Sequence, residues 1–207
     1  MVATERGGAP AFTEWHALEA LRRISLGEAG RLSLSSDLGI GEASARTLLD
    51  RLEREGLVVR TKRGRSLTGK GAAVLKALTS ITTLRPCSLP QVKGFERCFL
   101  TVLPIRPPRE LTEVYAIRDE LVARGCRLSL IGYLEEGVID FPGMPCELRS
   151  TIISSITIDS PYDEGALIMV PEGCSRELIG AMVQLVHRDC SSLTPRFNEV
   201  VRGDPSA

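Results

Sequence analysis

Basic side chains are concentrated in one short stretch of this 207-residue sequence. Residues 54–70 carry six Lys and Arg side chains against one acid. Such side chains bind phosphate groups, and Arg, Ser and Thr also contact the edges of DNA bases. The candidate DNA-binding residues are Ser44, Arg46, Thr47, Arg51, Arg54, Lys62, Arg63 and Arg65. The pattern indicates a surface that binds a polyanion.

Two elements must position these side chains. A helix from Gly41 to about Glu55 would place its apolar residues on one side and its basic and hydroxyl residues on the other. A strand over 57–61, a basic tip over 62–65 and a return over 66–67 predict a hairpin. We expect the helix to read the major groove of double-stranded DNA and the hairpin tip to lie along phosphates or in the minor groove.

The neighbouring elements complete a recognisable order. A helix is predicted over 13–26, then a short strand over 31–34 and a short helix that begins at Ser35 or Ser36. After the hairpin, Thr68 can cap a helix that runs to about Thr79. This order is that of a winged helix-turn-helix domain.

Two acids oppose this interpretation. Asp50 lies on the outer side of the predicted helix, where it could also pair with Arg46 or Arg54 at a spacing of four residues. Glu42 lies in the first turn, where it would stabilise the positive end of the helix dipole. A winged helix that binds protein instead of DNA therefore remains an alternative.

The net charge of zero conceals an uneven distribution. Residues 1–80 contain 13 basic and 9 acidic side chains, whereas residues 81–207 contain 13 and 17. A basic head on an acidic partner domain is expected from this split. No apolar run is long enough to span a membrane, and the first residues lack a secretory signal, so we expect no membrane association and a cytoplasmic location.

Cysteine and histidine spacing argues against a metal site. The six cysteines, at 87, 98, 126, 146, 174 and 190, form no CxxC pair, and the two histidines lie at 16 and 187. Zinc ligands normally come in closely spaced pairs. Cys98 and Cys126 lie in apolar segments, so we expect free, buried thiols, with a redox sensor as the alternative.

The second half alternates short apolar strands with helical segments. Strands are expected over 98–103, 127–134, 138–141 and 167–170, and helices over 111–124 and 175–188, with 147–158 ambiguous. The apolar face of 175–188 is interpreted as core, with a dimer seam as the alternative. The predicted organisation is a mobile tail (1–11), a winged helix-turn-helix domain (12–80), a linker (81–96) and a second domain (97–207). The fold class is α+β, the second domain being sandwich-like with a small mixed or antiparallel sheet.

The second half has no catalytic constellation in its sequence. It lacks a Gly-rich phosphate loop after a strand, a GxSxG motif and a histidine beside a plausible nucleophile. We therefore expect no enzyme activity and no cofactor. Arg118 and Asp119 are the pair we predict for a small-molecule effector site, against the plainer interpretation of a surface ion pair on a helix.

The residues 38–58, LGIGEASARTLLDRLEREGLV, and 63–71, RGRSLTGKG, resemble winged-helix regulators of the multiple-antibiotic-resistance repressor type. The stretch 115–143, YAIRDELVARGCRLSLIGYLEEGVIDFPG, together with the domain order, resembles an archaeal family of two-domain proteins described as transcription regulators. The resemblance implies a winged helix followed by a domain of unknown function. At low resolution the layout also resembles archaeal CTP-dependent riboflavin kinases, whose Gly-rich segment this sequence lacks.

The function expected from these observations is a DNA-binding transcription regulator. Dimerisation follows from the usual recognition of two DNA half-sites, and the second domain would sense a small molecule or mediate the dimer contact. A protein-binding winged helix and an enzyme with a winged-helix appendage are the alternatives.

Overall fold

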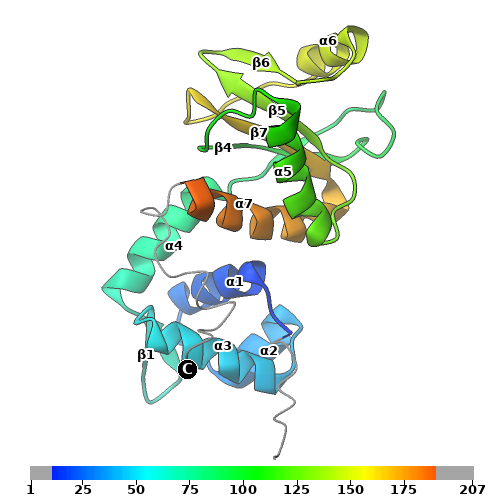
Figure 1. Cartoon of the computed structure of the whole chain (residues 1–207). Helices are drawn as coiled ribbons and strands as arrows, with labels where there is room; N and C mark the ends of the chain where they lie inside the picture. The colour runs from blue at the N-terminus through cyan, green and yellow to red at the C-terminus, as the bar shows by residue number, and fades with distance from the viewer. Residues whose placement is uncertain (1–10, 190–207) are drawn as a thin grey trace, which may run out of the picture. The chain divides into compact units, whose positions relative to one another are not determined.

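The computed structural model describes residues 11–189, which divide into two compact units between Leu75 and Lys76. We call residues 11–75 unit 1 and residues 76–189 unit 2. The fold is mixed α+β, as the sequence predicts (Figure 1). The candidate site at 44–65 lies wholly in unit 1.

Unit 1 contains three helices, a two-stranded hairpin and the start of a fourth helix. The elements are α1 (Glu14–Ser25), α2 (Arg31–Leu38), α3 (Glu42–Arg54), β1 (Val58–Arg60), β2 (Arg65–Leu67) and α4 (Gly69–Ile81), whose second half belongs to unit 2. The fully buried core side chains include Leu18, Leu21, Leu34, Leu48 and Leu52. Helices α2 and α3 pack against each other, and the hairpin follows α3 directly (Figure 1).

The segment 31–34, predicted as a strand, is helical. It forms the first half of α2, and neither Ser35 nor Ser36 caps a helix. The backbone of Gly30 is extended and precedes the first turn, where the Gly30 N–H donates to Ser33 Oγ at 3.2 Å. Leu34 and Leu38 are both buried, a spacing of four residues that fits a helix.

Unit 2 is built on a five-stranded antiparallel sheet. Its elements are β3 (Arg85–Cys87), β4 (Cys98–Leu103), α5 (Leu111–Ala123), β5 (Leu130–Glu135), β6 (Val138–Asp140), α6 (Cys146–Ser155), β7 (Glu164–Pro171), the 3-10 turn η1 (Glu172–Cys174) and α7 (Ser175–Asp189). The strand order is β3-β4-β7-β5-β6, and each neighbouring pair is antiparallel. Of the two predicted sheet types, the antiparallel one is therefore correct.

Helices cover the sheet of unit 2 on both faces. Helices α5 and α7 contact each other, with α7 against β4 and β7 (Figure 1). The apolar face of α7, which comprises Leu178, Ile179, Met182, Val183 and Val186, is buried, so its interpretation as core is confirmed. A second cluster unites Leu100 of β4, Leu167 of β7 and Ile152 of α6, all buried. The ambiguous segment 147–158 is thus mainly helix.

Residues 81–96, predicted as a linker, are instead part of unit 2. They contain the edge strand β3, which pairs with β4, and the buried side chains of Leu89 and Phe95. The prediction failed because Pro86 and a three-residue strand leave little periodicity, although proline is tolerated at a sheet edge.

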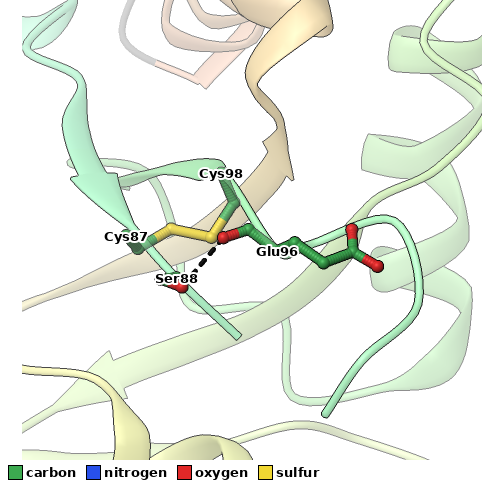
Figure 2. Close-up of a disulfide and its surroundings, with 4 residues drawn as sticks. All are labelled: Cys87, Ser88, Glu96 and Cys98. Carbon is green, nitrogen blue, oxygen red and sulfur yellow. Dashed lines mark hydrogen bonds between the residues drawn. A yellow bond between two sulfur atoms is a disulfide. The ribbon is translucent and has the colours of Figure 1, made fainter. Parts of the chain in front are cut away.

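A disulfide joins Cys87 to Cys98, which lie directly opposite each other in β3 and β4 (Figure 2). The Ser88 hydroxyl donates to the Glu96 carbonyl at 2.8 Å and closes the connecting loop. The expectation of free thiols is therefore wrong for this pair. Cys126, Cys146 and Cys174 are free, and Cys126 is buried as predicted. Cys190 lies outside the described residues.

Candidate nucleic-acid interface

Helix α3 has one buried side and one exposed side. Ala45, Leu48, Leu49 and Leu52 are buried against unit 1, as the helical wheel predicts. Arg46, Thr47, Asp50 and Arg54 are exposed. The helix therefore presents polar and basic side chains outward from an apolar back.

The tip of the β1–β2 hairpin is a closed turn that exposes its cations. Thr61 Oγ1 accepts hydrogen bonds from the N–H groups of Arg63 and Gly64 at 3.3 and 3.1 Å. Gly64 has a φ of +151°, and a Cβ at this position would lie 2.5 Å from the Ala29 carbonyl oxygen. Glycine is therefore required where the hairpin approaches Ala29. Lys62 and Arg63 are both exposed at the tip, as predicted.

Arg65 is the predicted contact residue that the structure assigns to another task. Its guanidinium lies 2.8 Å from Glu53 Oε2 and 3.5 Å from Asp50 Oδ1, and only 11% of its side chain is exposed. Arg65 thus joins the hairpin to α3 and is not presented to a ligand. The same contacts neutralise Asp50, which pairs with Arg65 and not with Arg46 or Arg54, the partners expected from helical spacing.

A hollow of about 220 Å³ lies where α2, α3 and β1 meet. Its lining includes Arg31, Arg46 and Arg60, together with the Arg65–Asp50 pair. Within residues 11–189, neither Arg46 nor Arg60 forms an ion pair. The Arg31 guanidinium comes no closer than 3.9 Å to Glu42 Oε2, so its ion pair is weak. The hollow therefore offers guanidinium groups whose charge is not cancelled, which match a phosphate or the edge of a guanine.

The remaining predicted residues of α3 are placed less favourably. The Thr47 hydroxyl donates to the Ala43 carbonyl at 3.0 Å, and Ser44 is half-buried. Arg51 packs over the ring of Phe12, with its guanidinium carbon 5.2 Å from the ring centre. Burial, and then the nearby charge of Arg54, lower the pKa of Arg51. Arg46 and Arg54 are the α3 arginines that remain accessible.

Sequence reasoning missed two residues of the hollow. Arg31 was not predicted as a site residue because 31–34 was interpreted as a strand. In the structure Arg31 is the first residue of α2 and lies beside α3. Arg60 lies directly opposite Arg65 in the β1–β2 register. Two like charges in such a position repel each other, a signal that one of them must turn away to an acid.

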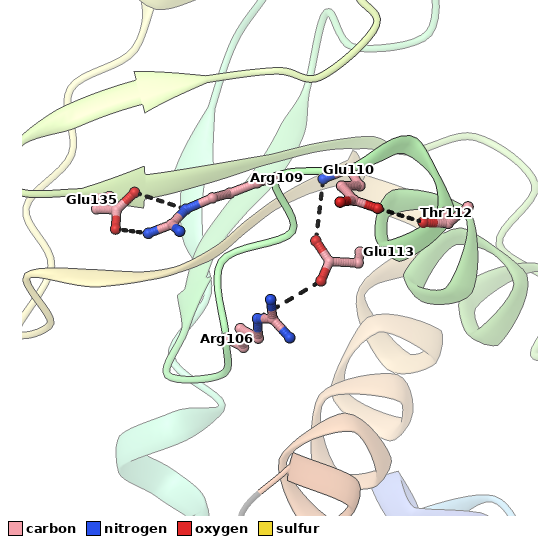
Figure 3. A network of polar contacts seen from close by, with 6 residues as sticks. All are labelled: Arg106, Arg109, Glu110, Thr112, Glu113 and Glu135. Carbon is pink, nitrogen blue, oxygen red and sulfur yellow. Dashed lines mark hydrogen bonds and ion pairs between the residues drawn. The ribbon is translucent and has the colours of Figure 1, made fainter.

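Most arginines in unit 2 are paired with acids, although the exposed Arg127 forms no ion pair within residues 11–189. Arg109, just before α5, binds Glu135 at the end of β5, which raises the pKa of Arg109, and Arg106 lies 3.8 Å from Glu113 (Figure 3). The predicted effector pair, Arg118 and Asp119, is an exposed ion pair of 3.1 Å with Arg118 also over the Tyr115 ring. Neither residue lines the hollow beside α3 or the two hollows next to β4 and β7 in unit 2, so the plainer interpretation as a surface ion pair fits their placement.

Neither a metal site nor a membrane-spanning helix is present in residues 11–189. They contain no group of three or more His, Cys, Asp and Glu side chains placed to hold a metal ion. Across the same residues, every helix is too short or too polar to traverse a bilayer.

The sequence matches no family model, and no curated protein is significantly similar to it. A solved structure of a hypothetical protein from Pyrococcus horikoshii OT3 is similar, with a TM-score of 0.58 and 24% sequence identity. The similarity covers 92% of this chain and 100% of that one. At this level of identity, the comparison supports the α+β fold alone.

Proposed function

We propose that unit 1 is a winged helix-turn-helix domain that binds double-stranded DNA, and that the chain is a transcription regulator. Helix α3 would enter the major groove, and the β1–β2 hairpin would be the wing on the phosphate backbone. Two copies would bind two half-sites. Unit 2 would sense a small molecule or join the two copies.

One observation carries this proposal: Arg46 and Arg60 form no ion pair among residues 11–189, while the neighbouring acids Asp50 and Glu53 are paired with Arg65. Both unpaired arginines line the hollow. Asp50 was the residue that favoured a protein-binding winged helix. With its charge compensated by Arg65, that alternative loses its main support.

Selection of bound sequences from random DNA at two salt concentrations would test the proposal. Arg46→Gln should reduce the discrimination between selected and random DNA, because Arg46 would contact bases. Arg60→Gln should weaken both about equally, because Arg60 would contact phosphate. Arg22→Gln is the matched control, since Arg22 lies on α1 in an ion pair with Glu19. Retention of no DNA at low salt, or equal behaviour of all three variants, would refute the proposal.

A further inference from the structure

Unit 2 contains a cavity of about 260 Å³ at the open end of its edge strand. Strand β4 continues for three residues beyond its pairing with β3, and Thr101 and Val102 line the cavity there. The last turn of α4 contributes Ser80, and the segment before β7 contributes Asp159 and Tyr162. The cavity therefore forms because β3 is too short to cover β4.

The charged groups of the lining are Arg85 and Asp159, joined at 2.6 Å. They differ in how firmly they are placed. Arg85 begins β3, two residues from the disulfide of Cys87, and 38% of its side chain is exposed. Asp159 lies in an irregular segment, and 85% of its side chain is exposed. An exposed ion pair adds little stability, so another carboxylate could replace Asp159 at low cost.

Two hydroxyl groups of the wall already donate their protons within the protein. Thr101 Oγ1 donates to the Thr83 carbonyl at 3.0 Å, and Ser80 Oγ donates to the Ala77 carbonyl at 2.7 Å. Leu100 and Val102 add a buried apolar surface. Among the lining residues, all within the described part of the chain, Arg85 is the cationic donor that a ligand would meet.

We propose that this cavity binds a small organic carboxylate with a short apolar body, whose carboxylate takes the place of Asp159 on Arg85. The guanidinium fork of arginine matches a carboxylate with two parallel hydrogen bonds. The apolar body would lie on Leu100 and Val102. Ligand pockets usually exceed about 300 Å³, so the size of this cavity favours a small metabolite.

The site also suggests how such a ligand could act. Ser80 lies in the last turn of α4, the helix that starts in unit 1 and ends in unit 2. A ligand that contacts this turn could bias the position of α4. This regulatory part of the inference rests on the proposed DNA-binding function, whereas carboxylate binding does not.

Isothermal titration of the full chain with isocaproate, isocaproamide and isoamylamine would test the site, because these probes share one apolar body and differ in their head group. Isocaproate should bind with a Kd of about 1 mM or below, and the amide and the amine at least about tenfold more weakly. No binding of isocaproate up to about 10 mM, or equal binding of the amine, would overturn the proposal.

Variants separate the roles of the two charged residues. Arg85→Gln should weaken isocaproate binding about tenfold or more. Asp159→Asn should tighten it, because the competing carboxylate is gone, and this exposed position should not affect folding. Arg97→Gln, which removes an exposed arginine paired with Glu172, is the matched control and should not change binding. Unchanged affinity in Arg85→Gln, or weaker binding in Asp159→Asn, would overturn the exchange of carboxylates.

The titrations contain no DNA, so the inference and the proposed function can fail separately. If isocaproate binds but no DNA is retained, the site stands and the function falls. If DNA is retained but no carboxylate binds, the function stands and the site falls. If both bind, isocaproate should change DNA affinity at constant ionic strength, and no change would overturn the regulatory part.

Discussion

The cations on the α3 and hairpin side of unit 1 differ from the arginines of unit 2 in how many of them are paired with acids. In unit 2, eight arginines form ion pairs with Asp or Glu: Arg85, Arg97, Arg106, Arg109, Arg118, Arg124, Arg149 and Arg188. On the α3 and hairpin side of unit 1, Arg46, Arg60, Lys62 and Arg63 form none with residues 11–189. Cations that are paired with acids project little field, whereas unpaired cations attract a polyanion. Charge in unit 2 is thus mostly structural, and charge at this face of unit 1 is available.

The wing provides the strongest test of this difference. Lys62→Gln combined with Arg63→Gln should weaken all DNA about hundredfold at about 50 mM salt and lower the salt slope by about 2, because two phosphate contacts are lost. Arg97→Gln combined with Arg118→Gln removes the same charge from ion pairs of unit 2 and should change affinity less than about twofold. Fluorescence anisotropy over a salt series measures both. Equal losses in the two double variants would show that only net charge matters.

The disulfide is a covalent link that unit 1 lacks, because all six cysteines of the sequence lie at residue 87 or beyond. Cys87 and Cys98 are separated by 11 residues. Reduction, or Cys87→Ser with Cys98→Ser, should lower the free energy of unfolding of unit 2 by about 2–3 kcal/mol. Thermal unfolding with and without reductant would show this shift, with the exposed Cys146→Ser as control. An unfolding curve unaffected by reductant would contradict it.

The sequence predicts the elements whose apolar residues repeat regularly. Helices α3, α5 and α7 and strands β4 and β7 are confirmed, because a long amphipathic or apolar run has a clear period. The prediction of a strand in the first half of α2 was wrong. Leu32 and Leu34 alternate like strand residues, although Leu32 is 61% exposed. Strand β3 was missed because three residues with a proline have no period to detect.

In the candidate site too, some side-chain positions follow from spacing along the sequence and others depend on contacts between elements. The exposure of Arg46, Lys62 and Arg63 follows from helical and hairpin spacing, and these predictions agree with the structure. The internal position of Arg65 could not be predicted, because its ion pairs with Asp50 and Glu53 join two elements through the tertiary fold. The disulfide could not be predicted for the same reason, because the prediction requires β3 to be recognised as the strand that pairs with β4.

Arg65 is the exception among the wing cations, and its removal would test whether it is structural. Arg65→Gln should cost about 1–2 kcal/mol of stability in unit 1, because Glu53 loses a charged hydrogen bond. It should also weaken DNA binding, because Asp50 and Glu53 then face the phosphates uncompensated. Adding Asp50→Asn to Arg65→Gln should restore part of the DNA affinity, as the coupling in a double-mutant cycle. Strictly additive effects of the two changes would contradict the assigned role.

The smallest expected effect is that of the Cys126 thiol, in unit 2, on how the free energy of unfolding depends on pH. Burial, and then the neighbouring thiol of Cys174, raise the pKa of the Cys126 thiol from 9.0 to about 12. Well below pH 9 the thiol is protonated in both the folded and the unfolded chain, so it adds no pH dependence there. Between about pH 9 and about pH 12 the unfolded chain releases this proton first, so the free energy of unfolding must fall as the pH rises.

Urea unfolding at about pH 8 and about pH 10 would measure this fall, and Cys126→Ala is the variant in which it should be smaller. Every other ionisable group is present in both proteins, so the difference between the two pH dependences isolates the thiol. Cys146 is exposed and should react with iodoacetamide in the folded chain, whereas Cys126 should not. Equal pH dependence in the wild type and in Cys126→Ala would mean that the folded chain releases this proton as readily as the unfolded chain, and unit 2 would then owe none of its alkaline sensitivity to Cys126.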